Sequence, residues 1–163
     1  MSEPLPVGHG LPMQRKYQIF ISSTYEDLIE ERRAVTGVVL SMGHIPVGME
    51  LFEAGNEDQW TYIRNRISEI DYYLVIVAER YGSIGREGLS YTEMEYRFAV
   101  EQGVPVAALL LDEKKRAEWP QRNIEFQKKK EVNAFRELCQ QKARLSTNRP
   151  VLVPLRERAY ACR

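Results

Sequence analysis

The fold of this chain is decided by Asp71-Tyr-Tyr-Leu-Val-Ile-Val-Ala78, which leads into Glu79-Arg-Tyr-Gly-Ser-Ile-Gly-Arg-Glu-Gly88 and then Ser90-Tyr-Thr-Glu-Met-Glu95. Residues 72–78 are almost all apolar, as is typical of a strand buried on both faces of a parallel sheet. A loop with three glycines follows, and then a helix that Ser90 or Thr92 caps and that ends at Gly103. Ligands of open α/β sheets bind where such loops leave the carboxyl ends of strands. We therefore expect the functional site beside this loop.

The segments around this stretch repeat the alternation of strand and helix. Residues 17–21, 44–49 and 104–111 are short apolar strands, and Pro46 favours an edge position for the second of them. Helices between them are marked by apolar residues at helical spacing: Leu28, Val35, Val38, Val39 and Met42 in the first, and Trp60, Ile63, Ile67 and Ile70 in the second. This pattern predicts a three-layer α/β fold with helices on both faces of a parallel sheet, in the strand order 2-1-3-4 with or without a fifth strand.

The last third of the chain is less regular. Residues 124–143 have partial helical periodicity, and the run Lys128-Lys129-Lys130 within them reads as a solvated helix face. Residues 150–155 are a candidate fifth strand that two prolines weaken. We accordingly divide the chain into a disordered leader over residues 1–15, an α/β domain over 16–145 and an irregular C-terminal extension over 146–163.

Composition narrows the classes of partner. The chain has 163 residues, 23 Lys plus Arg and 23 Asp plus Glu, so its formal net charge is zero. A neutral chain lacks the basic surface that binds nucleic acid or anionic membranes, and no apolar run approaches the roughly 18 residues that span a bilayer. Cys139 and Cys162 are too few and too far apart for a disulfide framework, which favours a reducing cytoplasm. The histidines, His9 and His44, show no metal-ligand spacing.

Several enzyme classes lack their motifs here. There is no phosphate-binding P-loop, no G-x-G-x-x-G turn and no G-x-S-x-G elbow, so the usual kinases, dehydrogenases and serine hydrolases are unsupported. The glycines at 82, 85 and 88 resemble a phosphate cradle only loosely, and a flexible surface loop is the alternative.

Ser22, Ser23 and Thr24 follow the first strand and precede the first helix. One of them is expected to cap that helix, since Ser23 and Thr24 each have an acidic residue three positions later. The free amides of a helix N-terminus also bind phosphate or a ribose hydroxyl, so the other two are candidates for a nucleotide contact.

Two glutamates on the third helix need separate interpretations. Glu93 completes a capping box with Ser90, and Glu95 completes one with Thr92, so both can be structural. Glu95, however, falls at the border between the sheet-packed and open surfaces, below the glycine-containing loop. A carboxylate there can bind two ribose hydroxyls or stabilise an oxocarbenium-like centre at an anomeric carbon. Cleavage of a nicotinamide nucleotide needs no general acid, because the leaving ring is already cationic.

The chain from Lys16 to about Glu113 resembles the domain-of-unknown-function family DUF4062. The resemblance is carried by Phe20-Ile-Ser-Ser-Thr-Tyr-Glu-Asp-Leu28, Glu30-Glu-Arg32, Gly43-His-Ile-Pro-Val-Gly-Met-Glu-Leu-Phe52, Asp71-Tyr-Tyr73, Arg80-Tyr-Gly-Ser83 and Ser90-Tyr-Thr-Glu-Met-Glu-Tyr96. That family is similar to Toll/interleukin-1 receptor (TIR) domains and to nucleoside 2-deoxyribosyltransferases, which share a flavodoxin-like sheet. In both relatives the functional glutamate stands four residues before a small residue of the third helix. Glu95 and Ala99 match that spacing, whereas Glu93 does not.

The resemblance implies a TIR-like domain that acts on the N-glycosidic bond of NAD or a related nucleotide in bacterial defence or signalling, without a further cofactor. Glu95 is then the catalytic residue, and the nucleotide contacts are Ser22, Ser23, Thr24, Arg80, Tyr81, Gly82, Ser83 and Glu93. Arg80 is the phosphate partner or else part of a surface salt bridge. The alternative is a non-catalytic module that binds a nucleotide or protein, self-associates through the loop from Met49 to Asn56 and regulates a fused effector. One departure is that Tyr91-Thr92 replaces the Trp-Cys pair of many TIR domains.

Overall fold

The computed structural model describes residues 15–48, 58–85, 87–145 and 152–155. Its strands are β1 (Gln18–Ser23), β2 (Ile45–Val47), β3 (Tyr72–Val77), β4 (Val106–Leu111) and β5 (Leu152–Leu155). Its helices are α1 (Ile29–Ser41), α2 (Asp58–Glu69), α3 (Tyr91–Glu101), α4 (Glu113–Arg116) and α5 (Lys129–Leu145), with short 3-10 turns η1 (Gln121–Asn123) and η2 (Phe126–Lys128).

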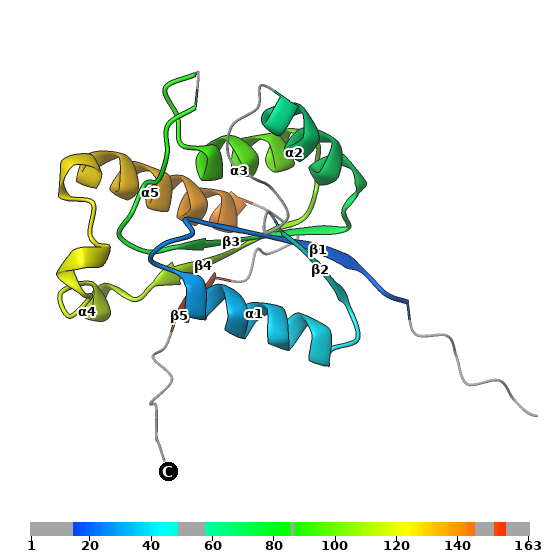
Figure 1. The fold of residues 1–163 in the computed structure, drawn as a ribbon, viewed down its shortest axis with the longest axis horizontal. Coiled ribbons are helices and arrows are strands. Elements are labelled where there is room, and N and C mark those ends of the chain that lie inside the picture. Colours follow the sequence, from blue (N-terminus) through cyan, green and yellow to red (C-terminus); the bar gives the residue numbers. More distant parts are fainter. Residues whose placement is uncertain (1–14, 49–57, 86, 146–151, 156–163) are drawn as a thin grey trace, which may run out of the picture.

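The strands form one parallel sheet in the order β2-β1-β3-β4-β5 (Figure 1). This confirms the predicted order 2-1-3-4 and the edge position of the strand that contains Pro46, and it adds the fifth strand, which the sequence left open. β5 pairs with β4 in parallel, from Ala108 opposite Leu152 to Leu111 opposite Leu155. The sheet therefore continues past residue 145, where we placed the end of the domain, into the segment predicted as an irregular extension.

Helices cover both faces of the sheet, because successive strand side chains point to opposite faces. α2, α3 and α5 lie on one side and α1 on the other (Figure 1). On the first side Phe20, Val75 and Val77 pack with residues of α2, α3 and α5. On the second side Ile21 and Ile76 pack with residues of α1. The three-layer, flavodoxin-like architecture is thus as predicted.

Two helix starts resolve alternatives that the sequence left open. Ser90 caps α3, since its hydroxyl accepts the amide of Glu93 at 3.2 Å. α1 begins later than predicted, at Ile29, and Leu28 precedes it without a side-chain cap. The prediction that one of Ser22, Ser23 and Thr24 caps this helix is therefore wrong.

The apolar stripe of α1 is also narrower than predicted. Leu28 and Val39 are buried, but Val38 and Met42 are 49% and 56% exposed. The buried Arg32 occupies the position on this stripe four residues after Leu28.

α5 is held to the sheet by a buried arginine. Arg136 donates to the main-chain oxygens of Val77 and Leu111, the last residues of β3 and β4, at 3.4 and 2.6 Å. It also pairs with Glu113 at 2.9 Å. One guanidinium thus donates hydrogen bonds to carbonyl oxygens at the ends of two strands. Without it, these buried oxygens would lack a donor.

We predict that Arg136→Met lowers the free energy of unfolding by roughly 2–4 kcal/mol, because buried carbonyl oxygens and Glu113 lose a charged donor. Urea denaturation followed by circular dichroism measures this change. Arg122→Met, at an exposed position of η1, is the control and should change the stability by no more than about 0.5 kcal/mol. Equal effects of the two substitutions would contradict the role of Arg136.

Candidate functional site

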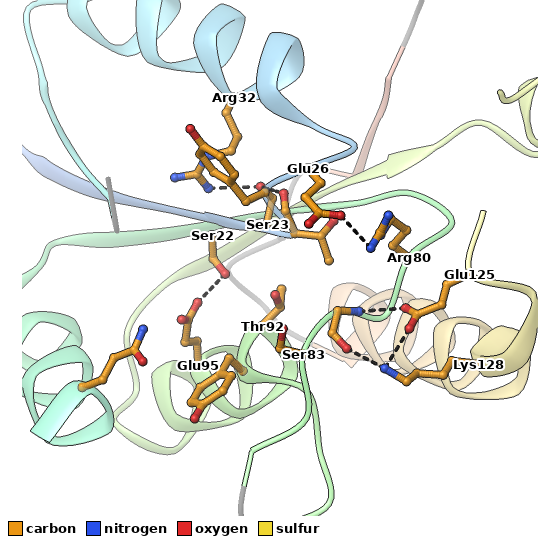
Figure 2. A pocket seen from close by; sticks show the side chains of 15 residues that line it. Ser22, Ser23, Glu26, Arg32, Arg80, Ser83, Thr92, Glu95, Glu125 and Lys128 are labelled. Atoms are coloured by element: carbon orange, nitrogen blue, oxygen red, sulfur yellow. Dashed lines mark hydrogen bonds and ion pairs between the residues drawn. The ribbon is translucent and has the colours of Figure 1, made fainter. Parts of the chain in front are cut away.

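A pocket of about 630 Å³ opens at the carboxyl ends of β1 and β3 (Figure 2). Here the chain leaves β1 for β2 on one side and β3 for β4 on the other, which is the switch point where open α/β sheets bind ligands. The pocket is lined by Ser22, Ser23, Thr24, Tyr25, Glu26, Arg32, Gln59, Arg80, Gly82, Ser83, Tyr91, Thr92, Glu95, Glu125 and Lys128.

Glu95 lies on one side of the pocket, on the second turn of α3, and is only 4% exposed. Its Oε2 accepts a hydrogen bond of 2.5 Å from the Ser22 hydroxyl at the end of β1. Burial raises the pKa of Glu95 to about 7, against the opposing effects of the Ser22 hydrogen bond and the positive charge of Arg32. The carboxyl group is therefore poised between its two protonation states near neutral pH.

Arg32 supports the β1 side of the pocket from α1. This buried guanidinium donates to the Ile21 carbonyl oxygen at 3.2 Å and to the Ser23 hydroxyl at 3.0 Å. Arg32 was not among the predicted site residues. Its position in the sequence could have indicated it, because Arg32 falls on the apolar face of an amphipathic helix, where an arginine needs a polar partner.

The loop after β3 supplies the opposite wall. Arg80 pairs with Glu26 at 2.9 Å, and both residues line the pocket, so Arg80 forms a salt bridge and also faces the site. Gly82 has φ +89°, and a Cβ atom there would lie 3.0 Å from the Thr24 methyl group. The two loops that follow β1 and β3 are thus in contact, and a side chain at position 82 would separate them.

Glu125 and Lys128, from the segment before α5, complete the wall on the side away from Glu95 (Figure 2). Glu125 Oε2 accepts the amides of Tyr81 and Gly82 at 2.9 and 3.1 Å, and its Oε1 lies 2.7 Å from Lys128 Nζ. Lys128 also donates to the Gly82 carbonyl oxygen at 2.8 Å. Burial alone would raise the pKa of Glu125, but these donors lower it below its usual value.

The interpretation of Lys128 as part of a solvated helix face is therefore wrong. Neither Glu125 nor Lys128 was predicted in the site, because both come from a part of the chain without a recognisable motif. α5 begins only at Lys129, and Phe126, taken as an apolar mark of this helix, is 62% exposed.

Seven of the nine predicted site residues line this pocket: Ser22, Ser23, Thr24, Arg80, Gly82, Ser83 and Glu95. The structure places the other two, Tyr81 and Glu93, in the interior instead. The Tyr81 hydroxyl donates to Glu93 Oε2 at 2.7 Å, and Arg97 donates to Glu93 Oε1 at 2.7 and 2.8 Å. Only the backbone amide of Tyr81 belongs to the pocket wall, through Glu125.

The glycines at 82, 85 and 88 do not line the pocket together, as a phosphate cradle made of all three would require. Gly82 is the only one of the three glycines that lines the pocket. A Cβ atom at Gly85 would lie 2.7 Å from the Met94 sulfur, so this glycine lets the loop pack on α3. Gly88 has φ +79° and serves the turn itself.

Other predictions can be placed only in part. The loop from Met49 to Asn56 lies outside the described residues, as does the leader up to residue 14. Across the described ranges, no cluster of three or more His, Cys, Asp or Glu side chains is suited to a metal ion. Within those same ranges, no helix has the length and apolar character to cross a bilayer.

Because the pKa of Glu95 is raised in the folded protein, the free energy of unfolding should depend on pH. The unfolded carboxyl ionises near pH 4.5 and the folded one near 7, so the folded protein loses stability as the pH rises between these values. Glu95→Gln removes this titration. We expect the variant to gain on the order of 3 kcal/mol over the wild type between pH 4.5 and 8, measured by urea denaturation at each pH.

Glu93→Gln is the matched control, since it makes the same change two residues away in the same helix. Because Glu93 is held by Arg97 and Tyr81, its variant should be less stable than the wild type at neutral pH by about 1–3 kcal/mol. If Glu95→Gln were also destabilising at pH 8, the assignment of Glu95 as a buried, uncompensated carboxyl would be incorrect.

A comparison with family models agrees with the resemblance to DUF4062 noted in the sequence. No curated protein matches the chain. A solved structure with a similar fold is that of a prokaryotic SEFIR domain, which is 16% identical, has a TM-score of 0.46, and is matched over 87% of this chain and 100% of its own. The model of a family described as "Domain of unknown function (DUF4062)" matches residues 18–151, which include every residue of the pocket. The chain therefore belongs to the DUF4062 family.

Proposed function

We propose that this domain cleaves the N-glycosidic bond of NAD or a related nucleotide, with Glu95 as the catalytic carboxylate. The observation that carries the proposal is the buried carboxyl of Glu95, with a pKa of about 7, facing a pocket at the switch point of the sheet. A group desolvated to this degree inside a cleft is a candidate for chemistry. The pocket volume of about 630 Å³ lies within the range of small-molecule sites.

In the proposed reaction, the bond between the ribose C1′ and the nicotinamide nitrogen breaks. Its electron pair stays with the ring, which leaves as neutral nicotinamide. The Glu95 carboxylate stabilises the positive charge that develops at C1′. Water then bonds to C1′ and gives up a proton, and Glu95 is placed to accept it. The products are nicotinamide, ADP-ribose and one proton.

Two basic side chains of the pocket wall are suited to an anionic part of the substrate, once it takes the place of their carboxylate partners. Arg80 and Lys128 line the wall formed after β3, away from Glu95. A nucleotide can therefore place its phosphates near these cations and its ribose near Ser22 and Glu95. The low dielectric around Glu95 strengthens its attraction for a cationic centre.

The resemblance to TIR domains and nucleoside 2-deoxyribosyltransferases points to the same glutamate. A role in bacterial defence or signalling, and self-association through the loop from Met49 to Asn56, belong to the proposal on the same basis. The alternative function is a non-catalytic module that binds a nucleotide and regulates a fused effector. The pairing of Arg80 with Glu26 and of Lys128 with Glu125 is compatible with a pocket that only binds.

Nicotinamide release from NAD tests the proposal. The purified chain at high concentration should release nicotinamide, resolved by chromatography, and Glu95→Gln should lower the rate by about 100-fold or more. Glu101→Gln is the control, because it is the same substitution at an exposed position of the same helix and should stay within about twofold. If neither the wild type nor the control releases nicotinamide, even at concentrations that favour oligomers, the enzyme proposal is wrong and the non-catalytic binding module is the better account.

The pH dependence of the reaction gives a second test. Only the ionised form of Glu95 can stabilise a cationic centre, so kcat/KM should fall as the pH drops through about 7. Ser22→Ala removes a hydrogen bond that favours the ionised form, and the inflection should move to higher pH. A rate independent of pH between 5.5 and 8.5 would exclude Glu95 as the group that must ionise.

A further inference from the structure

The carboxylate of Glu125 is bound as a ligand would be. One of its oxygens takes two consecutive backbone amides, those of Tyr81 and Gly82, at 2.9 and 3.1 Å. The other lies 2.7 Å from the Lys128 ammonium. Successive amides that converge on one point form a nest, which binds anions such as phosphate. The donor set around Glu125 is thus that of an anion site, and the protein fills it with its own side chain.

This site belongs to the pocket that contains Glu95. Gly82, Glu125 and Lys128 all line the pocket, and Figure 2 shows the Glu125–Lys128 pair across from Ser22 and Glu95. Arg80, one residue before the nest, is paired with Glu26 in the same way. Both basic residues of this wall therefore have a carboxylate partner from the protein itself.

The segment that carries Glu125 allows the side chain to be exchanged. Glu125 lies between the short turns η1 and η2, outside any α-helix or strand. Its side chain is 22% exposed and that of Lys128 is 30% exposed. The carboxylate can rotate into solvent without unwinding α5 or breaking a pairing of the sheet, and the amides of Tyr81 and Gly82 then need another acceptor.

We propose that the amides of Tyr81 and Gly82, with Lys128, form the subsite for a phosphate group of the nucleotide, and that Glu125 occupies this subsite until the ligand displaces it. The inference rests on the proposed function for the identity of the nucleotide. A phosphate offers more acceptor oxygens and more negative charge than the carboxylate it replaces. Occupation by Glu125 raises the apparent Kd of every phosphate-bearing ligand, because only the fraction of molecules with an open subsite can bind.

Calorimetric binding to the full chain tests this, with inorganic pyrophosphate, ADP-ribose and nicotinamide riboside as probes. Nicotinamide riboside has no phosphate group and serves as the phosphate-free reference for the subsite. All variants also carry Glu95→Gln, so that no probe is consumed. Glu125→Gln should tighten pyrophosphate and ADP-ribose by about tenfold and leave the riboside unchanged. Lys128→Met should weaken the two phosphate-bearing probes and again leave the riboside unchanged.

Glu118→Gln is the matched control. Glu118 pairs with Lys115 at 2.8 Å and with the same i,i+3 spacing as the pair of Lys128 and Glu125, but it lies outside the pocket. Its substitution should change none of the three affinities. Glu125→Ala is a second variant, and its melting temperature shows whether the loss of the side chain unfolds the protein. If Glu125 only occupies the subsite, the folded fraction of Glu125→Ala should also bind pyrophosphate more tightly than the parent protein does.

The outcomes separate this inference from the proposed function. If Glu125→Gln and Glu125→Ala weaken all three probes equally and lower the melting temperature, Glu125 is a structural brace and the inference is wrong. Unchanged or undetectable pyrophosphate binding in both variants overturns it as well. If pyrophosphate tightens as expected while NAD is not cleaved by the wild type, the subsite stands and the enzyme proposal fails. If the wild type cleaves NAD but the Glu125 variants bind all three probes as the parent protein does, the enzyme proposal stands and the subsite inference fails.

Discussion

The pairing of β1 with β3 is the constraint on which the candidate site depends. These two strands run parallel from Ile19 opposite Tyr72 to Ser23 opposite Ile76, so their carboxyl ends lie side by side. β2 and β4 lie on the outer sides of this pair, and none of the five strands that the structure describes covers the crevice between the loops that leave it. Ser22 reaches α3 from one strand end, and Gly82 contacts Thr24 from the other. Residues about sixty positions apart in the sequence thereby line one pocket.

The charged groups of this pocket differ in how deeply they are buried and in whether they have a partner of opposite charge. Glu95 is desolvated, and burial disfavours its charged form more than the hydrogen bond from the neutral Ser22 hydroxyl and the charge of Arg32 favour it. Arg80 and Lys128 are closer to solvent and each has a carboxylate partner. A cationic centre would gain from the first environment and an anionic group from the second. The proposed nucleotide, with its cationic base and its phosphate chain, would match this arrangement, and the carboxyl that lowers the stability of the folded protein stands where such a ligand would use it.

The sequence was sufficient for the fold and for the β1 and β3 sides of the site. Apolar strand runs, Pro46 and the helical spacing of Ile63 and Ile67 determine layers and order locally, and those signals agree with the structure. The details that failed depend on long-range contacts. Tyr81 sits in a loop beside pocket residues, yet its ring packs inward against Glu93, which no local pattern indicates. Glu125 lies 43 and 44 residues from the amides it accepts, in a segment with no motif, so only the folded chain places it there.

The different fates of Glu93 and Glu95 show how one helix can give two carboxylates separate tasks. Residues two positions apart on a helix point to different sides, so these two do not share neighbours. Glu93 faces Tyr81 and receives Arg97 from the next turn, which together satisfy both of its oxygens. Glu95 faces the end of β1, where a serine hydroxyl meets one oxygen and the pocket lies beside it. A carboxylate whose acceptors are already filled holds a helix in place. A carboxylate with an oxygen left to accept a further hydrogen bond, in a desolvated cleft, is available to a ligand, and this distinction supports the proposed role of Glu95 independently of its spacing in the sequence.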